Sequence, residues 1–176
     1  RLTRLDLSMN QLQQLPGELG DLTALEDLDV RSNQLAAVPE SLGNLIVLRE
    51  LDLRGNALST VPDSFRHLTA LRVLGLSENN LTEIPASVLN LTGLERIYLG
   101  QNRLTEIPGE IGTFTRLESL GLERNSLTSL PEELRNLREL DYLNVKENMI
   151  ENVDARVEKL FSNHRRVRPL TKPQRT

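Results

Sequence analysis

A repeat of 23 residues runs through almost the whole chain and restricts its fold more than any other feature. One asparagine marks each unit, and these asparagines are spaced 23 residues apart without exception: Asn10, Asn33, Asn56, Asn79, Asn102, Asn125 and Asn148. Repeats of about 20 to 50 residues are typical of solenoids, because one unit buries its apolar face only against its neighbours. The spacing therefore predicts seven stacked units.

Each unit follows the pattern L-x-x-L-x-L-x-x-N-x-L-x-x-L-P-x-x-L-x-x-L-x-x, and every apolar position holds Leu, Ile, Val or Phe. The alternation at residues 5–7 predicts a short strand. An asparagine amide both donates and accepts hydrogen bonds, so we expect the seven asparagines to form a structural ladder through the interior. The residue before proline is extended, and proline suits the first position of a short 3-10 or single-turn helix. Acids such as Glu18 and Glu40 stand in the first turn of these helices.

The motif resembles that of the leucine-rich repeat family, and the resemblance covers residues 2–160. The 23-residue form with its Leu-Pro step looks like the intracellular class found in Scribble-type scaffolds, plant Ras-group-related repeats, Roco proteins and bacterial effectors. The resemblance implies an α/β fold, a curved right-handed solenoid of about seven repeats. Its parallel sheet would line the concave face and short 3-10 or α segments the convex face.

The last repeat departs from the pattern, because Asp154 stands where proline is expected. The residues that follow place four apolar side chains on one helix face: Val153, Val157, Leu160 and Phe161. We therefore expect a leucine-rich repeat domain over residues 1–163, with a capping helix at about 154–163. The remaining residues, 164–176, are basic and predict a disordered tail or linker.

The first repeat shows no such cap. Leu2, Leu5 and Leu7 belong to a coil with nothing stacked before it, although terminal repeats need a polar cap. We expect that an N-terminal cap or earlier repeats are missing from this chain. An uncapped coil of this kind favours self-association, while the oligomeric state itself is left open.

Composition narrows the classes of function. The net charge is −4, which disfavours nucleic acid and anionic membranes as partners. The chain has no Cys and only two histidines, His67 and His164, which argues against a metal site, a cofactor and a nucleophile–base pair. No apolar run is long enough to span a membrane, so no membrane insertion is expected. The resemblance to the intracellular repeat class implies a cytoplasmic location, with a bacterial effector delivered into a host cell as the alternative.

The strand residues between the buried leucines face outward and form stripes across the predicted sheet. In the early coils Arg31 and Arg54 lie beside Asp29 and Asp52, whereas later coils carry aromatic residues flanked by Gly75 and Gly121, which predicts an accessible Tyr98 ring. Tyrosine and arginine are enriched at interface hot spots. The predicted partner-binding residues of the concave face are Arg31, Arg54, Arg96, Tyr98 and Tyr142. The alternative is a solvated sheet face with ion pairs across its strands and no partner.

Three aspartates, Asp6, Asp29 and Asp52, would stand about 5 Å apart along neighbouring strands. Stacked carboxylates suit Ca²⁺ or a paired acid and base. Arg31 and Arg54 neutralise this charge, which disfavours both uses.

The leading hypothesis is a non-enzymatic protein-interaction module that binds a protein or peptide through its concave face. The alternative is the substrate-recognition domain of a larger enzyme, such as a bacterial effector ubiquitin ligase, a kinase or a Roco-type GTPase.

Overall fold

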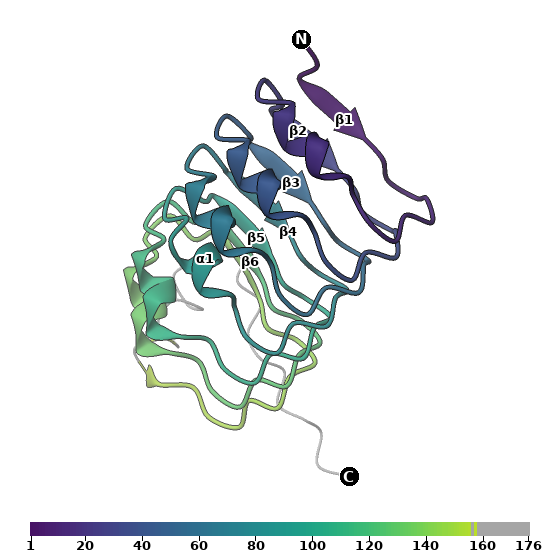
Figure 1. Cartoon of the computed structure of the whole chain (residues 1–176). Coiled ribbons are helices and arrows are strands. Elements are labelled where there is room, and N and C mark those ends of the chain that lie inside the picture. Colours follow the sequence, from purple (N-terminus) through teal and green to yellow (C-terminus); the bar gives the residue numbers. More distant parts are fainter. Residues whose placement is uncertain (156, 158–176) are drawn as a thin grey trace.

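The computed structural model of the chain describes residues 1–155 and 157, and these form a solenoid whose coils each contribute one strand (Figure 1). The strands build a single seven-stranded sheet in chain order, and every neighbouring pair is parallel. The register is 23 residues, so Leu5 pairs with Leu28 and Leu28 with Leu51. The strands are β1 (Arg4–Asp6), β2 (Asp27–Asp29), β3 (Glu50–Asp52), β4 (Val73–Gly75), β5 (Arg96–Tyr98), β6 (Ser119–Gly121) and β7 (Tyr142–Asn144). The predicted α/β solenoid is confirmed.

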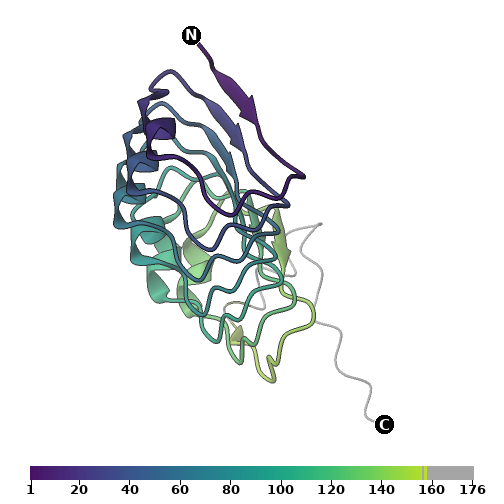
Figure 2. The same cartoon turned by 45° about the vertical axis from the view of Figure 1, so that its right-hand side comes forward.

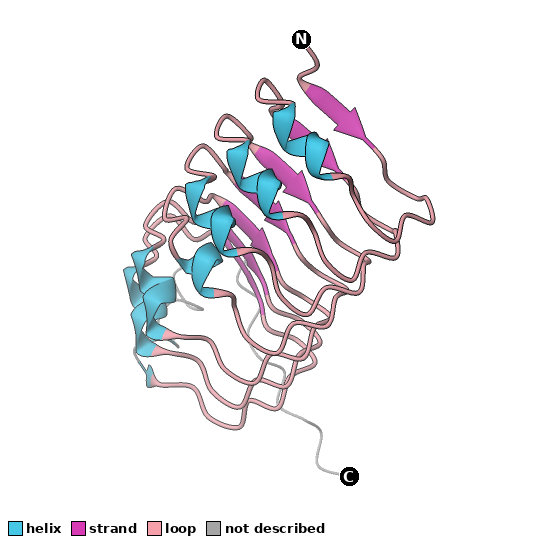
Figure 3. Ribbon diagram, viewed as in Figure 1, coloured by secondary structure: helices cyan, strands magenta, loops and turns pink. Residues whose placement is uncertain are grey.

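Short helices line the outer side of the coils, away from the sheet (Figures 2 and 3). Five are 3-10 helices and one is a single α-turn: η1 (Gly17–Asp21), η2 (Glu40–Asn44), η3 (Asp63–His67), α1 (Ala86–Leu89), η4 (Gly109–Thr113) and η5 (Glu132–Asn136). In the described part of the chain, the proline of each repeat precedes the helix instead of occupying the first helical position, which corrects the expectation. At Pro16 the backbone is extended, with φ −69° and ψ 147°, so the ring sets the direction from which the chain enters η1.

The core lies between the sheet and the helices and consists of the apolar positions of the repeat. Leu28, Leu51 and Leu74 point inward from successive strands and are at most 2% exposed. Phe65 and Phe114 are the largest fully buried side chains. The first coil is more open: Leu2 is 49% exposed, and Leu5 and Leu7 are only partly buried. Self-association through this coil stays a prediction.

The asparagine side chains tie each coil to the coil before it. Asn79 donates to the carbonyl oxygens of Leu53 in the preceding coil and Leu76 in its own coil, at 3.0 and 3.1 Å. Its amide oxygen accepts the N–H of Leu58 at 2.9 Å. The same bonds to both coils recur at Asn33, Asn56, Asn102, Asn125 and Asn148. Asn10 is exposed and binds only carbonyls of its own coil, those of Leu7 and Ser8.

The residue before each asparagine has a positive φ, which the sequence pattern did not reveal. Gly55 is the one glycine at these positions (φ 64°). The others carry side chains in the same conformation: Met9, Ser32, Glu78, Gln101, Arg124 and Glu147, with φ between 54° and 58°. This left-handed residue turns the chain so that the following asparagine faces inward.

We expect Gly55→Ala to lower the free energy of unfolding by about 1 kcal/mol, the cost of placing a Cβ in the left-handed region. Steric conflict adds nothing, because a Cβ on Gly55 would lie 3.4 Å from its nearest neighbours. Gly55→Asn is the matched control and should cost less, since asparagine tolerates this conformation. Urea denaturation of the two variants measures the difference. Equal losses would contradict the assignment to backbone strain.

Glycines set the spacing of the first three outer helices. A Cβ on Gly43 would lie 2.5 Å from the carbonyl oxygen of Ser64, so η2 and η3 pack closely only because that atom is missing. The close approach allows the Ser64 hydroxyl to donate to the Glu40 carbonyl at 2.6 Å. Gly20 makes the same approach to Ser41, whose hydroxyl donates to the Gly17 carbonyl.

This packing is interrupted at α1 and returns between η4 and η5, where a Cβ on Gly112 would lie 2.8 Å from the carbonyl oxygen of Glu133. Arg66 stands at the position that Gly43 occupies one coil earlier and Gly20 two coils earlier. The corresponding hydroxyl, that of Ser87, is buried and has no hydrogen-bond partner within the described part of the chain. Arg66 on η3 therefore takes the place of the glycine at the junction where the next element, α1, is an α-turn instead of a 3-10 helix.

At the C-terminal end, Ala155 and Val157 are helical, and Val157 is fully buried. The N–H of Val157 donates to the carbonyl of Asp154 at 2.9 Å. The rest of the predicted capping helix and the predicted tail lie outside the described residues, so the predicted domain boundary at 163 stays a prediction.

Candidate functional site

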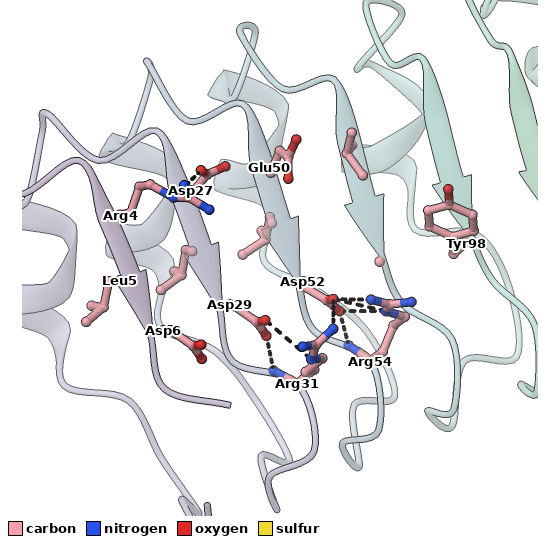
Figure 4. Close-up of a pocket in the computed structure, with 14 residues that line it drawn as sticks. Arg4, Leu5, Asp6, Asp27, Asp29, Arg31, Glu50, Asp52, Arg54 and Tyr98 are labelled. Atoms are coloured by element: carbon pink, nitrogen blue, oxygen red, sulfur yellow. Dashed lines mark hydrogen bonds and ion pairs between the residues drawn. The ribbon is translucent and has the colours of Figure 1, made fainter. Parts of the chain in front are cut away.

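The open face of the sheet carries two adjoining hollows. The first, which we call the N-terminal hollow, has a volume of about 500 Å³ and is lined by residues of β1 to β4 together with Arg31, Arg54 and Tyr98 (Figure 4). The second, the C-terminal hollow, has a volume of about 660 Å³ and is lined by Arg96, Tyr98, Glu118, Ser119, Glu139, Asp141 and Tyr142. Tyr98 borders both hollows, so it stands at the centre of the candidate site.

The arginines of the N-terminal hollow form ion pairs with carboxylates of the same chain (Figure 4). Arg31 lies between two aspartates of neighbouring coils, 3.3 Å from Asp29 and 3.8 Å from Asp52. The Nε of Arg54 donates to both oxygens of Asp52, at 2.9 and 3.0 Å, and this hydrogen bonding raises the pKa of the Arg54 guanidinium. Arg4 pairs with Asp27 at 2.9 Å. Both Arg31 and Arg54 are thus paired inside the chain.

Asp6, which precedes Asp29 and Asp52 by one and two coils, has a different environment. Hydrogen bonds from Ser8 lower the pKa of Asp6, and Arg31 adds a weaker attraction. Asp6, Asp29 and Asp52 stand opposite one another in the sheet register. Within residues 1–155 and 157, no group of three or more His, Cys, Asp or Glu side chains is arranged to hold a metal ion.

Tyr98 differs from the expectation of a freely accessible ring. Gly75 and Gly121 flank it in the neighbouring strands, as predicted. The guanidinium carbon of Arg54, however, lies 5.8 Å from the ring centroid, within the range of a cation–π contact. Gly75 makes this contact possible, because a Cβ there would lie 3.1 Å from the Cγ of Arg54. Tyr98 is therefore half-buried, held on one side by Arg54.

The C-terminal hollow has aromatic walls and an acidic edge. Tyr98 and Tyr142 come from strands two coils apart, with Ser119 in the strand between them. Tyr142 is 39% exposed. Arg96 lies 3.4 Å from Glu118, and both side chains are about half exposed, so this pair is weak.

Sequence reasoning found the tyrosines and Arg96 but missed the acids of this hollow. Glu118 and Asp141 directly precede β6 and β7, and Glu139 lies two residues before Asp141. The stripes considered in the sequence began at the first strand residue. One further repeat position toward the N-terminus would have revealed Glu95, Glu118 and Asp141 in successive coils.

Comparison with family models matches most of the chain to leucine-rich repeats. A model described as leucine-rich repeat region matches residues 40–171, and a single leucine-rich repeat matches residues 1–22. The comparison with curated proteins gave no match. No helix within the described part of the chain is both long and apolar enough to cross a membrane.

Solved structures show the same architecture. A leucine-rich repeat protein of Leptospira interrogans is 30% identical with a TM-score of 0.83, and the match covers 97% of this chain. The leucine-rich repeat ectodomain of the Arabidopsis thaliana membrane receptor kinase GASSHO1/SCHENGEN3, in complex with CASPARIAN STRIP INTEGRITY FACTOR 2, is 33% identical with a TM-score of 0.79 over 90% of this chain. The plant peptide hormone receptor RGFR1, in complex with RGF2, is 30% identical with a TM-score of 0.67 over 84%.

The chain spans only part of these structures: 50% of the Leptospira protein, 20% of the GASSHO1/SCHENGEN3 chain and 28% of the RGFR1 chain. Two of them are receptor structures, and one is an ectodomain, so the cytoplasmic location and the intracellular repeat class stay predictions. The family models and the shared coil architecture agree with the 23-residue repeat. The chain therefore belongs to the leucine-rich repeat family.

Proposed function

We propose that the chain is a non-enzymatic interaction module that binds a protein or an extended peptide across the open face of its sheet. The observation that carries the proposal is the pair of adjoining hollows with Tyr98 between them. Half-buried aromatic side chains surrounded by polar groups are typical of interface hot spots. Two similar structures, those of GASSHO1/SCHENGEN3 and RGFR1, are complexes with CASPARIAN STRIP INTEGRITY FACTOR 2 and RGF2, which supports a peptide as the kind of partner.

The proposed anchors are Tyr98 and Tyr142, the walls of the C-terminal hollow. Arg31, Arg54 and Arg96 contribute to the charge of the face while their guanidinium groups stay paired with Asp52, Asp29 or Glu118. An extended partner that crosses several coils would contact both hollows, because they share Tyr98.

Peptides selected from a random displayed library against the whole chain test this proposal. We expect Tyr98→Ala combined with Tyr142→Ala to weaken the selected peptides by about 2 kcal/mol, or about thirtyfold, as for two hot-spot residues. The melting temperature should change little, since neither ring belongs to the buried core. Biolayer interferometry measures the affinity and thermal denaturation the stability.

The matched control is Arg66→Ala combined with His67→Ala on η3, on the opposite side of the coils. This variant should bind the selected peptides as tightly as the unchanged chain. Loss of binding in this control, with normal binding by the tyrosine variant, would contradict the proposed surface.

A second candidate function is the recognition part of a larger enzyme. One observation favours it: GASSHO1/SCHENGEN3 is a membrane receptor kinase, and this chain matches 20% of the chain solved for its ectodomain. The binding surface proposed above serves either function, and sequencing of the flanking reading frame for a catalytic domain decides between them.

A further inference from the structure

We infer that the C-terminal hollow accepts a lysine or arginine side chain of the partner, which makes the partner a basic peptide segment. This inference rests on the proposed function and adds the chemistry of the ligand. It is carried by three features of one hollow: two aromatic walls, the small residue Ser119 between them and more carboxylates than cations at one edge.

The spacing of the strands sets the distance between the two aromatic walls of the hollow. Tyr98 and Tyr142 stand on strands separated by β6, so their Cα rows are about 10 Å apart at the usual spacing of parallel strands. Between them, β6 contributes Ser119 and Gly121, which lie opposite Tyr142 and Tyr98 in the register. The Tyr98 ring and Glu123 lie over Gly121, so Ser119 is the small residue that leaves room between the rings for the aliphatic stem of one long side chain.

The charges select the head group of that side chain. Glu118 and Glu139 line the edge of the hollow before β6 and β7, and Arg96 is the one cation among the residues that line the hollow. The carboxylate of Glu139 has no ion-pair or hydrogen-bond partner within residues 1–155 and 157. A lysine or arginine suits this arrangement, because its stem packs on aromatic surface while its charged end reaches the polar edge.

The N-terminal hollow favours the same sign of charge. Its lining contains five carboxylates, those of Asp6, Asp27, Asp29, Glu50 and Asp52, and three arginines that are all ion-paired. An acidic or phosphorylated segment would meet like charge in both hollows, at a cost that opposes binding.

The test uses the peptides selected against the whole chain, resynthesised with each Lys or Arg replaced in turn by Gln. We expect one basic position whose replacement weakens binding at least about tenfold, as for the loss of one member of a charge pair. The protein variant Glu118→Gln with Glu139→Gln should weaken the parent peptide by a similar factor. The same variant should no longer discriminate between the parent and the Gln peptide, which a double-mutant cycle detects.

Two further variants sharpen the result. Glu106→Gln with Glu110→Gln removes two exposed carboxylates of the fifth coil away from both hollows, and should leave the affinity unchanged. Arg96→Ala removes the one cation among the residues that line the C-terminal hollow, and should tighten binding of the basic peptide. Weaker binding by Arg96→Ala would overturn the inference, because it would make Arg96 an anchor for an acidic or polar group.

The outcomes separate this inference from the proposed function. Failure to select any peptide, or peptides indifferent to Tyr98→Ala with Tyr142→Ala, contradicts the proposed function. A second result would contradict the inference and leave the proposed function standing. In that case the selected peptides lose affinity for the tyrosine variant, but no basic residue of theirs shows energetic coupling to Glu118 or Glu139.

Discussion

Asn79→Leu is expected to lower the free energy of unfolding by about 1 to 3 kcal/mol, the cost of leaving a buried polar group without its partner. The substitution removes the partner of the Leu58 N–H. It also removes one of the two asparagine donors to each of the Leu53 and Leu76 carbonyls, which keep their bonds to the neighbouring asparagines. Asn79 is 7% exposed, so water does not replace these bonds. Urea denaturation followed by circular dichroism measures the loss.

Asn10→Leu is the matched control. Asn10 is exposed, and its amide binds only Leu7 and Ser8 of the same coil, so this variant should cost less than about 0.5 kcal/mol. Hydrogen exchange gives a second readout, because the Leu58 amide should lose protection in Asn79→Leu. Equal midpoints for the two variants would show that the ladder does not stabilise the stack.

Gly43→Ala should also destabilise the fold strongly, by about 2 to 3 kcal/mol, the range for overpacking a site that does not relax. The added Cβ would meet the backbone carbonyl and the Cβ of Ser64, neither of which is the movable end of a side chain. Moving η2 away from η3 would also break the hydrogen bond from the Ser64 hydroxyl to Glu40.

Gly17→Ala is the matched control, and its expected change in the free energy of unfolding has the opposite sign. Nothing lies within 4 Å of a Cβ placed on Gly17, so alanine there should stabilise the chain by about 0.5 kcal/mol through the unfolded state. The two Gly→Ala variants differ only in what the new methyl group meets. If Gly43→Ala proves as stable as Gly17→Ala, glycine does not set the spacing of η2 and η3.

The two stability predictions concern different layers of the solenoid, and together they explain how the candidate binding face is held. The asparagines bond coil to coil between the strands and the outer helices, while glycine and serine fit the outer helices against one another. Tyr98 and Tyr142 belong to neither layer. Substitution of these tyrosines therefore tests binding with little disturbance of the stack.

The periodic features of the chain were predictable from its sequence. The parallel register, the inward leucines and the positions of the strands and helices follow from a pattern that every coil repeats. A structure built from identical steps needs only the step to be known, because each coil packs on the next in the same way. The strands were misplaced by one residue, since strands such as Leu5–Leu7 were predicted where the structure has Arg4–Asp6.

Only the tertiary structure decided the features that break the period. Arg31 bridges aspartates of two coils, and Arg54 reaches across Gly75 to Tyr98, although the sequence equally allowed each arginine to stay beside its own aspartate. Neighbouring strands are about 5 Å apart, so a long side chain finds several partners within reach, and the exact shape around it selects among them. The same holds for Arg66, which interrupts the close glycine packing of the outer helices, and for the acids that edge the C-terminal hollow. The repeat determines the scaffold, whereas the contacts between unlike residues of adjacent coils determine the candidate binding site.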